Sequence, residues 1–95
     1  MNRINLLERD AINFSQSIFR TSKAPTLEYY DGEISSRLYP ISREQDKIVF
    51  LNKMKEEIIV QRDKHRVDCT SKIREECVHE QEYGYSLYII DKLLA

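Results

Sequence analysis

Two histidines and two cysteines stand close together in one charged segment of the chain: His65, Cys69, Cys77 and His79. Imidazole and thiolate side chains are common ligands of Zn²⁺, which usually takes four ligands in a tetrahedron. His65 and Cys69 are four residues apart, so on a helix they would share a face. Cys77 and His79 would diverge by roughly 160° on a helix. A zinc site made from His65, Cys69 and Cys77, with His79 pointing away, is therefore the best metal hypothesis.

The same four side chains also fit an ordinary structural role. A free cysteine commonly behaves as a small buried hydrophobe, which suits Cys77 in a helical core. Cys69 would then lie at a turn and both histidines at the surface. The Cys-x-x-Cys pair that marks many zinc sites does not occur. We therefore expect no metal and no cofactor, and we keep a zinc-stabilised domain that uses His65, Cys69 and Cys77 as an alternative.

Sequence motifs of enzymes are missing from the chain. It has no nucleophile elbow, no glycine-rich phosphate-binding loop and no His-Glu-x-x-His segment. His79 and Glu80 begin the last of these motifs, but Tyr83 stands where its second histidine belongs. We therefore expect a protein that is not an enzyme.

Three basic residues fall on the apolar face of a predicted helix. At about 100° per residue, Lys55, Arg62 and Arg66 share a stripe with apolar residues, namely Ile48, Leu51, Ile58 and Ile59. A buried charge needs a partner, so the three basic residues are candidates for contact with an acidic protein partner. Alternatively, their aliphatic stems cover apolar surface while the charged ends reach solvent. Nucleic-acid binding through this basic stripe is a further alternative, which the net charge of −1 disfavours.

Tyr29, Tyr30 and Tyr39 form a second group of candidates for partner binding. Tyrosine combines a large apolar ring with a polar tip, so it suits both the edge of a core and a recognition surface. We expect these tyrosines to cover one end of the helical core, and a binding role is the alternative.

The elements that position these residues begin with a predicted helix over residues 3–20. Its apolar residues recur at intervals of three and four, which places them on one stripe: Ile4, Leu7, Ala11, Phe14 and Ile18. The connector 21–41 breaks this pattern. Its Asp31-Gly32 pair is typical of a type I′ turn, so a minor β-hairpin within residues 25–39 is one interpretation. An irregular connector with a short helical turn is the other.

Helical patterning resumes after the connector. Ser42 and Gln45 fit a capping box and predict a helix over residues 42–67. Apolar periodicity predicts another helix over residues 71–94. A single helix across both segments would be about 60 Å long, so we place a break near residues 67–71, where short polar and β-branched residues weaken helix propensity.

Gly84 falls inside the last predicted helix. Glycine there costs about 1 kcal/mol relative to alanine. Its presence therefore indicates either the close approach of another helix or a break in this one.

Bulk composition indicates one domain over residues 1–95, since 95 residues with 41% hydrophobic and 33% charged side chains can form a single modest core. No segment approaches the ~20 apolar residues of a membrane helix, and the charged N-terminus does not resemble a signal peptide. We therefore expect no membrane association and a cytoplasmic location.

The expected fold is all-α: a small three-helix bundle, or a helical hairpin plus an N-terminal helix. Residues 48–51 are apolar on every side of their helical turn, which suggests cover from two helices or from a second chain, so a homodimer is one expectation. The predicted function is a small non-enzymatic protein-interaction or oligomerisation module, accessory or regulatory, whose biological process the sequence does not identify.

Overall fold

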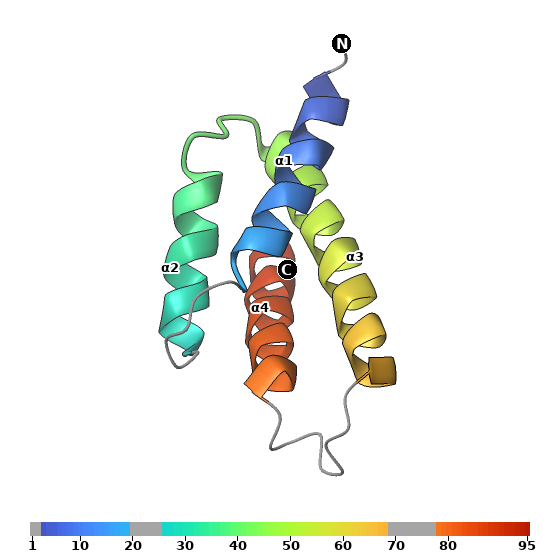
Figure 1. The fold of residues 1–95 in the computed structure, drawn as a ribbon. Coiled ribbons are helices and arrows are strands. Elements are labelled where there is room, and N and C mark those ends of the chain that lie inside the picture. The colour runs from blue at the N-terminus through green and yellow to red at the C-terminus, as the bar shows by residue number, and fades with distance from the viewer. Residues whose placement is uncertain (1–2, 20–25, 69–77) are drawn as a thin grey trace.

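The computed structural model describes residues 3–19, 26–68 and 78–95. These residues form four helices: α1 (Arg3–Ser17), α2 (Leu27–Leu38), α3 (Glu44–Asp68) and α4 (Val78–Leu94) (Figure 1). The described ranges contain no strand, so the predicted all-α class is confirmed. None of these four helices is both long enough and apolar enough to cross a membrane.

Successive helices run in opposite directions (Figure 1). The order in which the helices pack differs from their order in the chain. α1 packs mainly on α3, α3 packs on α4, and α4 packs on α2. α1 and α3 run in the same direction, as do α2 and α4 (Figure 1). Side chains connect the first two helices: the Arg37 guanidinium lies 4.8 Å from the ring centre of Phe14. The rings of Phe19 and Tyr30 are 6.0 Å apart.

α2 replaces the β-hairpin that was one interpretation of residues 25–39, and that interpretation is wrong. Thr26 caps the helix, because its side-chain oxygen accepts a hydrogen bond of 3.1 Å from the backbone N–H of Tyr29. Tyr30, Ile34 and Leu38 recur every four residues and are all buried. This helical spacing outweighs the Asp31-Gly32 turn signal, and no described glycine has the positive φ that a type I′ turn requires.

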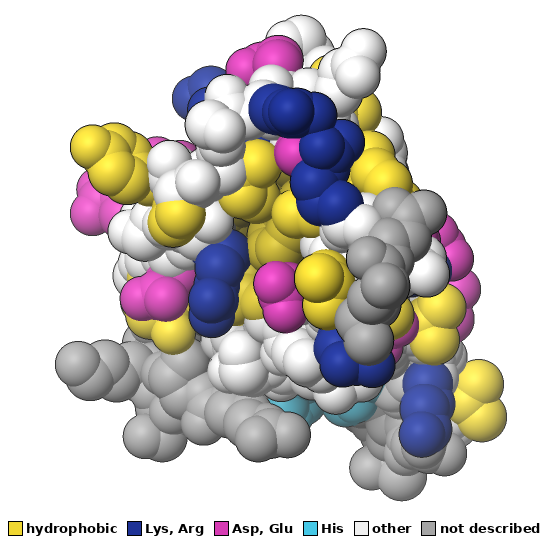
Figure 2. All heavy atoms as spheres, turned by 90° about the horizontal axis from the view of Figure 1, so that it is seen from above, with side chains coloured by type: hydrophobic (Ala, Val, Ile, Leu, Met, Phe, Trp, Pro, Cys, Tyr) yellow, Lys and Arg dark blue, Asp and Glu magenta, His cyan; other side chains and the backbone are white. Residues whose placement is uncertain are grey.

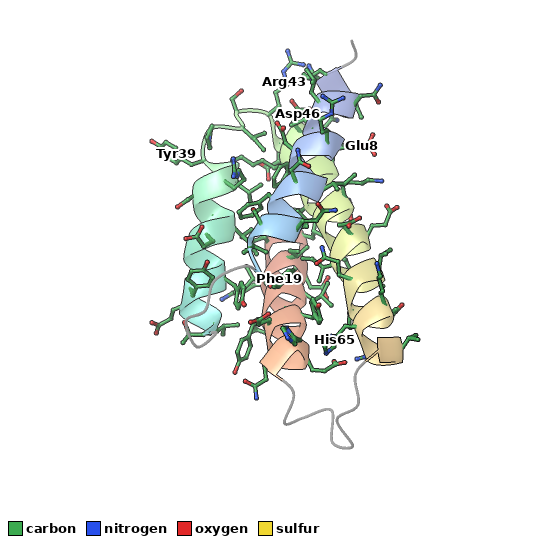
Figure 3. All side chains as sticks on the ribbon, viewed as in Figure 1. Glu8, Phe19, Tyr39, Arg43, Asp46 and His65 are labelled. Carbon is green, nitrogen blue, oxygen red and sulfur yellow. The ribbon has the colours of Figure 1, made fainter. Side chains whose placement is uncertain are left out.

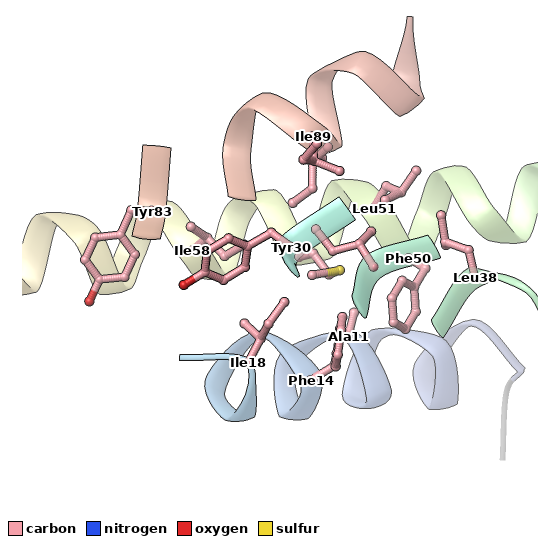
Figure 4. Close-up of a cluster of buried hydrophobic side chains, with 13 residues drawn as sticks. Ala11, Phe14, Ile18, Tyr30, Leu38, Phe50, Leu51, Ile58, Tyr83 and Ile89 are labelled. Atoms are coloured by element: carbon pink, nitrogen blue, oxygen red, sulfur yellow. The ribbon is translucent and has the colours of Figure 1, made fainter. Parts of the chain in front are cut away.

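The core runs along the bundle, from Leu38 near one end to Tyr83 near the other (Figure 4). Each helix contributes to its buried apolar side chains, which are Ala11, Phe14, Ile18, Tyr30, Ile34, Leu38, Phe50, Leu51, Met54, Ile58, Tyr83, Ile89 and Ile90. The stripe predicted for the first helix supplies three of them, and its Ile4 and Leu7 are half-buried. The two-sided turn at 48–51 buries Phe50 and Leu51 but leaves Ile48 partly exposed.

Helix α4 passes through Gly84 without a break, so a break there is ruled out. The close approach expected at this position is also wrong, because a Cβ built on Gly84 would meet nothing within 4 Å. α3 ends at Asp68, within the stretch where a break was predicted. Residues 71–77 of the predicted last helix lie outside the described residues.

Candidate functional site

The three basic candidates on α3 each contact a carboxylate of their own chain. Lys55 Nζ lies 2.7 Å from Asp91 Oδ1 on α4. Arg66 makes two hydrogen bonds to Glu80, also on α4, with Nε to Oε1 at 2.7 Å and Nη2 to Oε2 at 3.0 Å. The third pair, at 3.2 Å, joins Arg62 to its neighbour Asp63 and does not cross between helices.

Of these pairs, Arg66 with Glu80 has the strongest geometry, because a guanidinium that grips both oxygens of one carboxylate is oriented as well as charged. These hydrogen bonds, together with the charges of Glu80 and Asp63, raise the pKa of Arg66 despite an opposing effect of burial. The acidic partners expected for basic residues on the apolar face of α3 therefore come from the same chain. Partner contact by Lys55, Arg62 and Arg66 stays a prediction.

The three tyrosine candidates occupy different environments. Tyr30 is buried in the core, and its ring meets that of Tyr29 edge to face, with centres 5.1 Å apart. Burial, and secondarily the charges of Glu82 and Tyr29, raises the pKa of Tyr30 above that of an ordinary tyrosine. Tyr39 is 89% exposed and projects from the end of α2 (Figure 3). Among these tyrosines, Tyr39 is thus the one whose ring offers a large free surface.

Tyr39 borders a hollow of about 310 Å³ between the end of α2, the start of α3 and the end of α4. We call this feature the apolar hollow; its lining consists of Ser35, Leu38, Tyr39, Glu44, Lys47, Ile48, Leu51 and Leu93. The volume is at the lower end of the roughly 300–1,000 Å³ typical of ligand-binding clefts. Two buried core residues, Leu38 and Leu51, contribute to its lining.

The rim of the apolar hollow carries large side chains that the fold leaves partly uncovered. Ile48 is 43% exposed and Leu93 is 41% exposed. The end of the bundle seen from above has hydrophobic side chains in view among basic and acidic ones (Figure 2). Ile48 and Leu93 were not predicted as binding residues. The signal that could have indicated Ile48 was the turn at 48–51, which is apolar on every side. Packing within the chain buries Phe50 and Leu51 but leaves Ile48 partly exposed.

The opposite end of the bundle brings the two histidines together. The rings of His65 on α3 and His79 on α4 meet edge to face, with centres 4.7 Å apart. His65 lies near the C-terminal end of α3 (Figure 3). The expectation that His79 points away from His65 is therefore wrong. It compared His79 only with neighbours on one helix, whereas the contact joins two helices.

A buried carboxylate lies behind this histidine pair. The Glu82 side chain is only 7% exposed, and its Oε2 atom is 3.5 Å from Nδ1 of His79. No hydrogen-bond partner of Oε2 occurs within the described part of the chain. A buried carboxylate oxygen without a hydrogen bond is costly, so Glu82 is an unusual feature of this end of the bundle.

The zinc hypothesis of the sequence rested on His65, Cys69 and Cys77, and both cysteines lie outside the described residues. Among residues 3–19, 26–68 and 78–95, no group of three or more histidine, cysteine, aspartate or glutamate side chains could hold a metal ion. Within those ranges, the histidine contact is therefore a pair and not a complete tetrahedral site.

Comparison of the chain with protein-family models, with curated proteins and with solved structures finds no match.

Proposed function

We propose that this protein is a non-enzymatic interaction module that binds a short apolar segment of a partner protein in the apolar hollow. The observation that supports this most directly is the juxtaposition of Tyr39, Ile48 and Leu93 around one concave surface. Exposed apolar side chains scattered singly are normal, whereas apolar side chains that surround a cleft are typical of binding sites.

The chemistry of the apolar hollow indicates what kind of segment fits. Its charged lining residues are one acid, Glu44, and one base, Lys47, so it favours neither sign of charge. Tyrosine is enriched among residues that dominate binding energy at interfaces, and Tyr39 is placed to cover an inserted side chain. A helix or extended peptide that presents a few large apolar side chains would match this surface.

A second copy of the chain is a less suitable occupant than a short segment. A stable dimer commonly buries about 800 Å² on each partner. The apolar hollow has room for only a few side chains. Besides its apolar side chains and Tyr39, its lining consists of the polar or charged residues Ser35, Glu44 and Lys47. The homodimer expected from residues 48–51 therefore becomes an outcome of the test, and a cytoplasmic setting remains part of the proposal.

Nucleic-acid binding has less support than protein binding. It depended on Lys55, Arg62 and Arg66, each of which contacts a carboxylate of the chain itself. A nucleic acid would have to compete with these carboxylates for the same cations.

The test is selection of peptides from a displayed random library on the immobilised protein, followed by affinity measurement in solution. Ile48→Ser and Leu93→Ser should weaken binding of a selected peptide at least about tenfold, which corresponds to about 1.4 kcal/mol. Val60→Ser and Val67→Ser are matched controls, because both valines are exposed on α3 but do not line the apolar hollow. Peptides whose binding is insensitive to the hollow variants would contradict the proposal. Native mass spectrometry of the same samples reports a homodimer.

A further inference from the structure

The histidine pair has the spacing of two ligands of one metal ion. Metal–nitrogen bonds of about 2.0–2.1 Å place the ring centres of two imidazoles on one zinc roughly 5 Å apart. The ring centres of His65 and His79 are 4.7 Å apart, and the planes are inclined at 61°. The two rings come from adjacent helices, so the packing of α3 on α4 sets their separation.

Glu82 gives the pair a second feature of metal sites. A histidine that binds a metal through one ring nitrogen usually donates the other N–H to a carboxylate, carbonyl or water. Nδ1 of His79 faces Oε2 of Glu82 at 3.5 Å, which leaves Nε2 on the far side of the ring, and the His79 side chain is 55% exposed. Oε2 of Glu82 is buried and has no hydrogen-bond partner among the described residues, so a shorter contact with the Nδ1–H of His79 would satisfy it.

We propose that His65 and His79 form a two-imidazole site for a divalent transition-metal ion such as Zn²⁺, with Glu82 as the group that orients His79. Imidazole suits zinc, copper and nickel better than magnesium or calcium. Water completes the coordination, since the His79 side chain is 55% exposed. Because His65 lies on α3 and His79 on α4, a bound ion ties these two helices together. This inference does not depend on the apolar hollow.

The test is calorimetric titration of the reduced protein with ZnCl₂, with thermal unfolding followed in parallel. The unmodified chain should bind one ion, and its melting temperature should rise with the zinc concentration. His65→Ala and His79→Ala should each weaken binding at least about tenfold, and Glu82→Gln should weaken it by about ten- to a hundredfold. Unfolding of each variant without zinc shows whether it is folded.

Cys69→Ser combined with Cys77→Ser is the decisive control, because thiols bind zinc tightly. Zinc affinity within about twofold of the unmodified chain supports a site made of the two imidazoles. Loss of binding in the cysteine variant overturns that site, whether or not the histidine variants also lose binding. Absence of zinc binding to the unmodified chain overturns it as well.

Discussion

The end of the bundle that carries the apolar hollow differs from the end that carries the histidine pair in what its side chains already contact. At the first end, Tyr39, Ile48 and Leu93 remain partly or largely exposed after folding. At the other end, Arg66 grips Glu80, His79 meets both His65 and Glu82, and all of these contacts lie between or within α3 and α4.

The two ends therefore differ in whether contacts within the chain already occupy their candidate binding residues. Each of the three basic residues on the apolar face of α3 contacts a carboxylate of its own chain. Such pairing is expected because an unpaired charge is costly to bury. An apolar group has no such requirement and remains partly exposed if no helix covers it. The proposed interaction surface therefore rests on the uncovered apolar side chains around the hollow.

The strongest test of the contrast compares the floor and the rim of the apolar hollow. Leu51 is 2% exposed and Ile48 is 43% exposed, although both line the same feature. Leu51→Ala should lower the free energy of unfolding by about 2–5 kcal/mol, because it leaves a cavity in the core. Ile48→Ala should change it by only about 0.5 kcal/mol. Urea unfolding measures both, and similar losses would mean that Ile48 is a core residue.

A second test concerns the buried carboxylate at the histidine end. Glu82→Gln keeps the shape of the side chain but removes the charge that burial disfavours. We expect the free energy of unfolding to rise by about 1–2 kcal/mol in metal-free buffer, as measured by urea unfolding. Glu82→Ala serves as a control for lost packing. A decrease for the glutamine variant would show that the carboxylate makes a stabilising contact.

A smaller effect is expected at Gly84, in the part of α4 near the histidine pair. A Cβ at this position meets nothing within 4 Å, and its φ is not positive. Gly84→Ala should therefore raise the free energy of unfolding by about 0.5–1 kcal/mol. Gly32→Ala in α2 is the matched variant, since its surroundings are equally open. If alanine destabilises position 84, a neighbour must approach it more closely than the structure shows.

The smallest effect should come from Lys55 and Asp91. Their ion pair is short at 2.7 Å, but the side chains are 39% and 57% exposed. Solvent screening limits such pairs, so a double-mutant cycle with Lys55→Met and Asp91→Asn should give a coupling below about 0.5 kcal/mol that falls further in salt. A larger, salt-resistant coupling would place this pair among the fixed contacts of the core.

The sequence predicted the helices whose apolar residues follow a regular period and missed the one whose period was hidden. Ala11, Phe14 and Ile18 recur at helical intervals, and all three are buried as predicted. In α2 the informative residues were Tyr30, Ile34 and Leu38, four apart, but Asp31-Gly32 within that run resembled a turn. Burial of the apolar face of α2 outweighed the local turn preference of Asp31-Gly32. That burial depends on helices elsewhere in the chain, so a local pattern does not reveal it.

The candidate sites were harder to predict, because both of them depend on contacts between helices. The helical period places His65 on α3 and His79 on α4, but it does not report how the two helices are rotated against each other. The same applies to Leu93, which contributes to a hollow only because the end of α4 lies beside the start of α3. Sequence periodicity describes one helix at a time, whereas these features arise from packing.

The pairing of α1 with α3 has a consequence for how the protein is made. During synthesis α1 leaves the ribosome before α3, its main packing partner, which follows only after α2. At roughly 5–20 residues per second, the apolar face of α1 waits on the order of a few seconds for its cover. The nascent chain therefore displays Phe14 and Ile18 to its surroundings during that interval, and early chaperone contact is expected there.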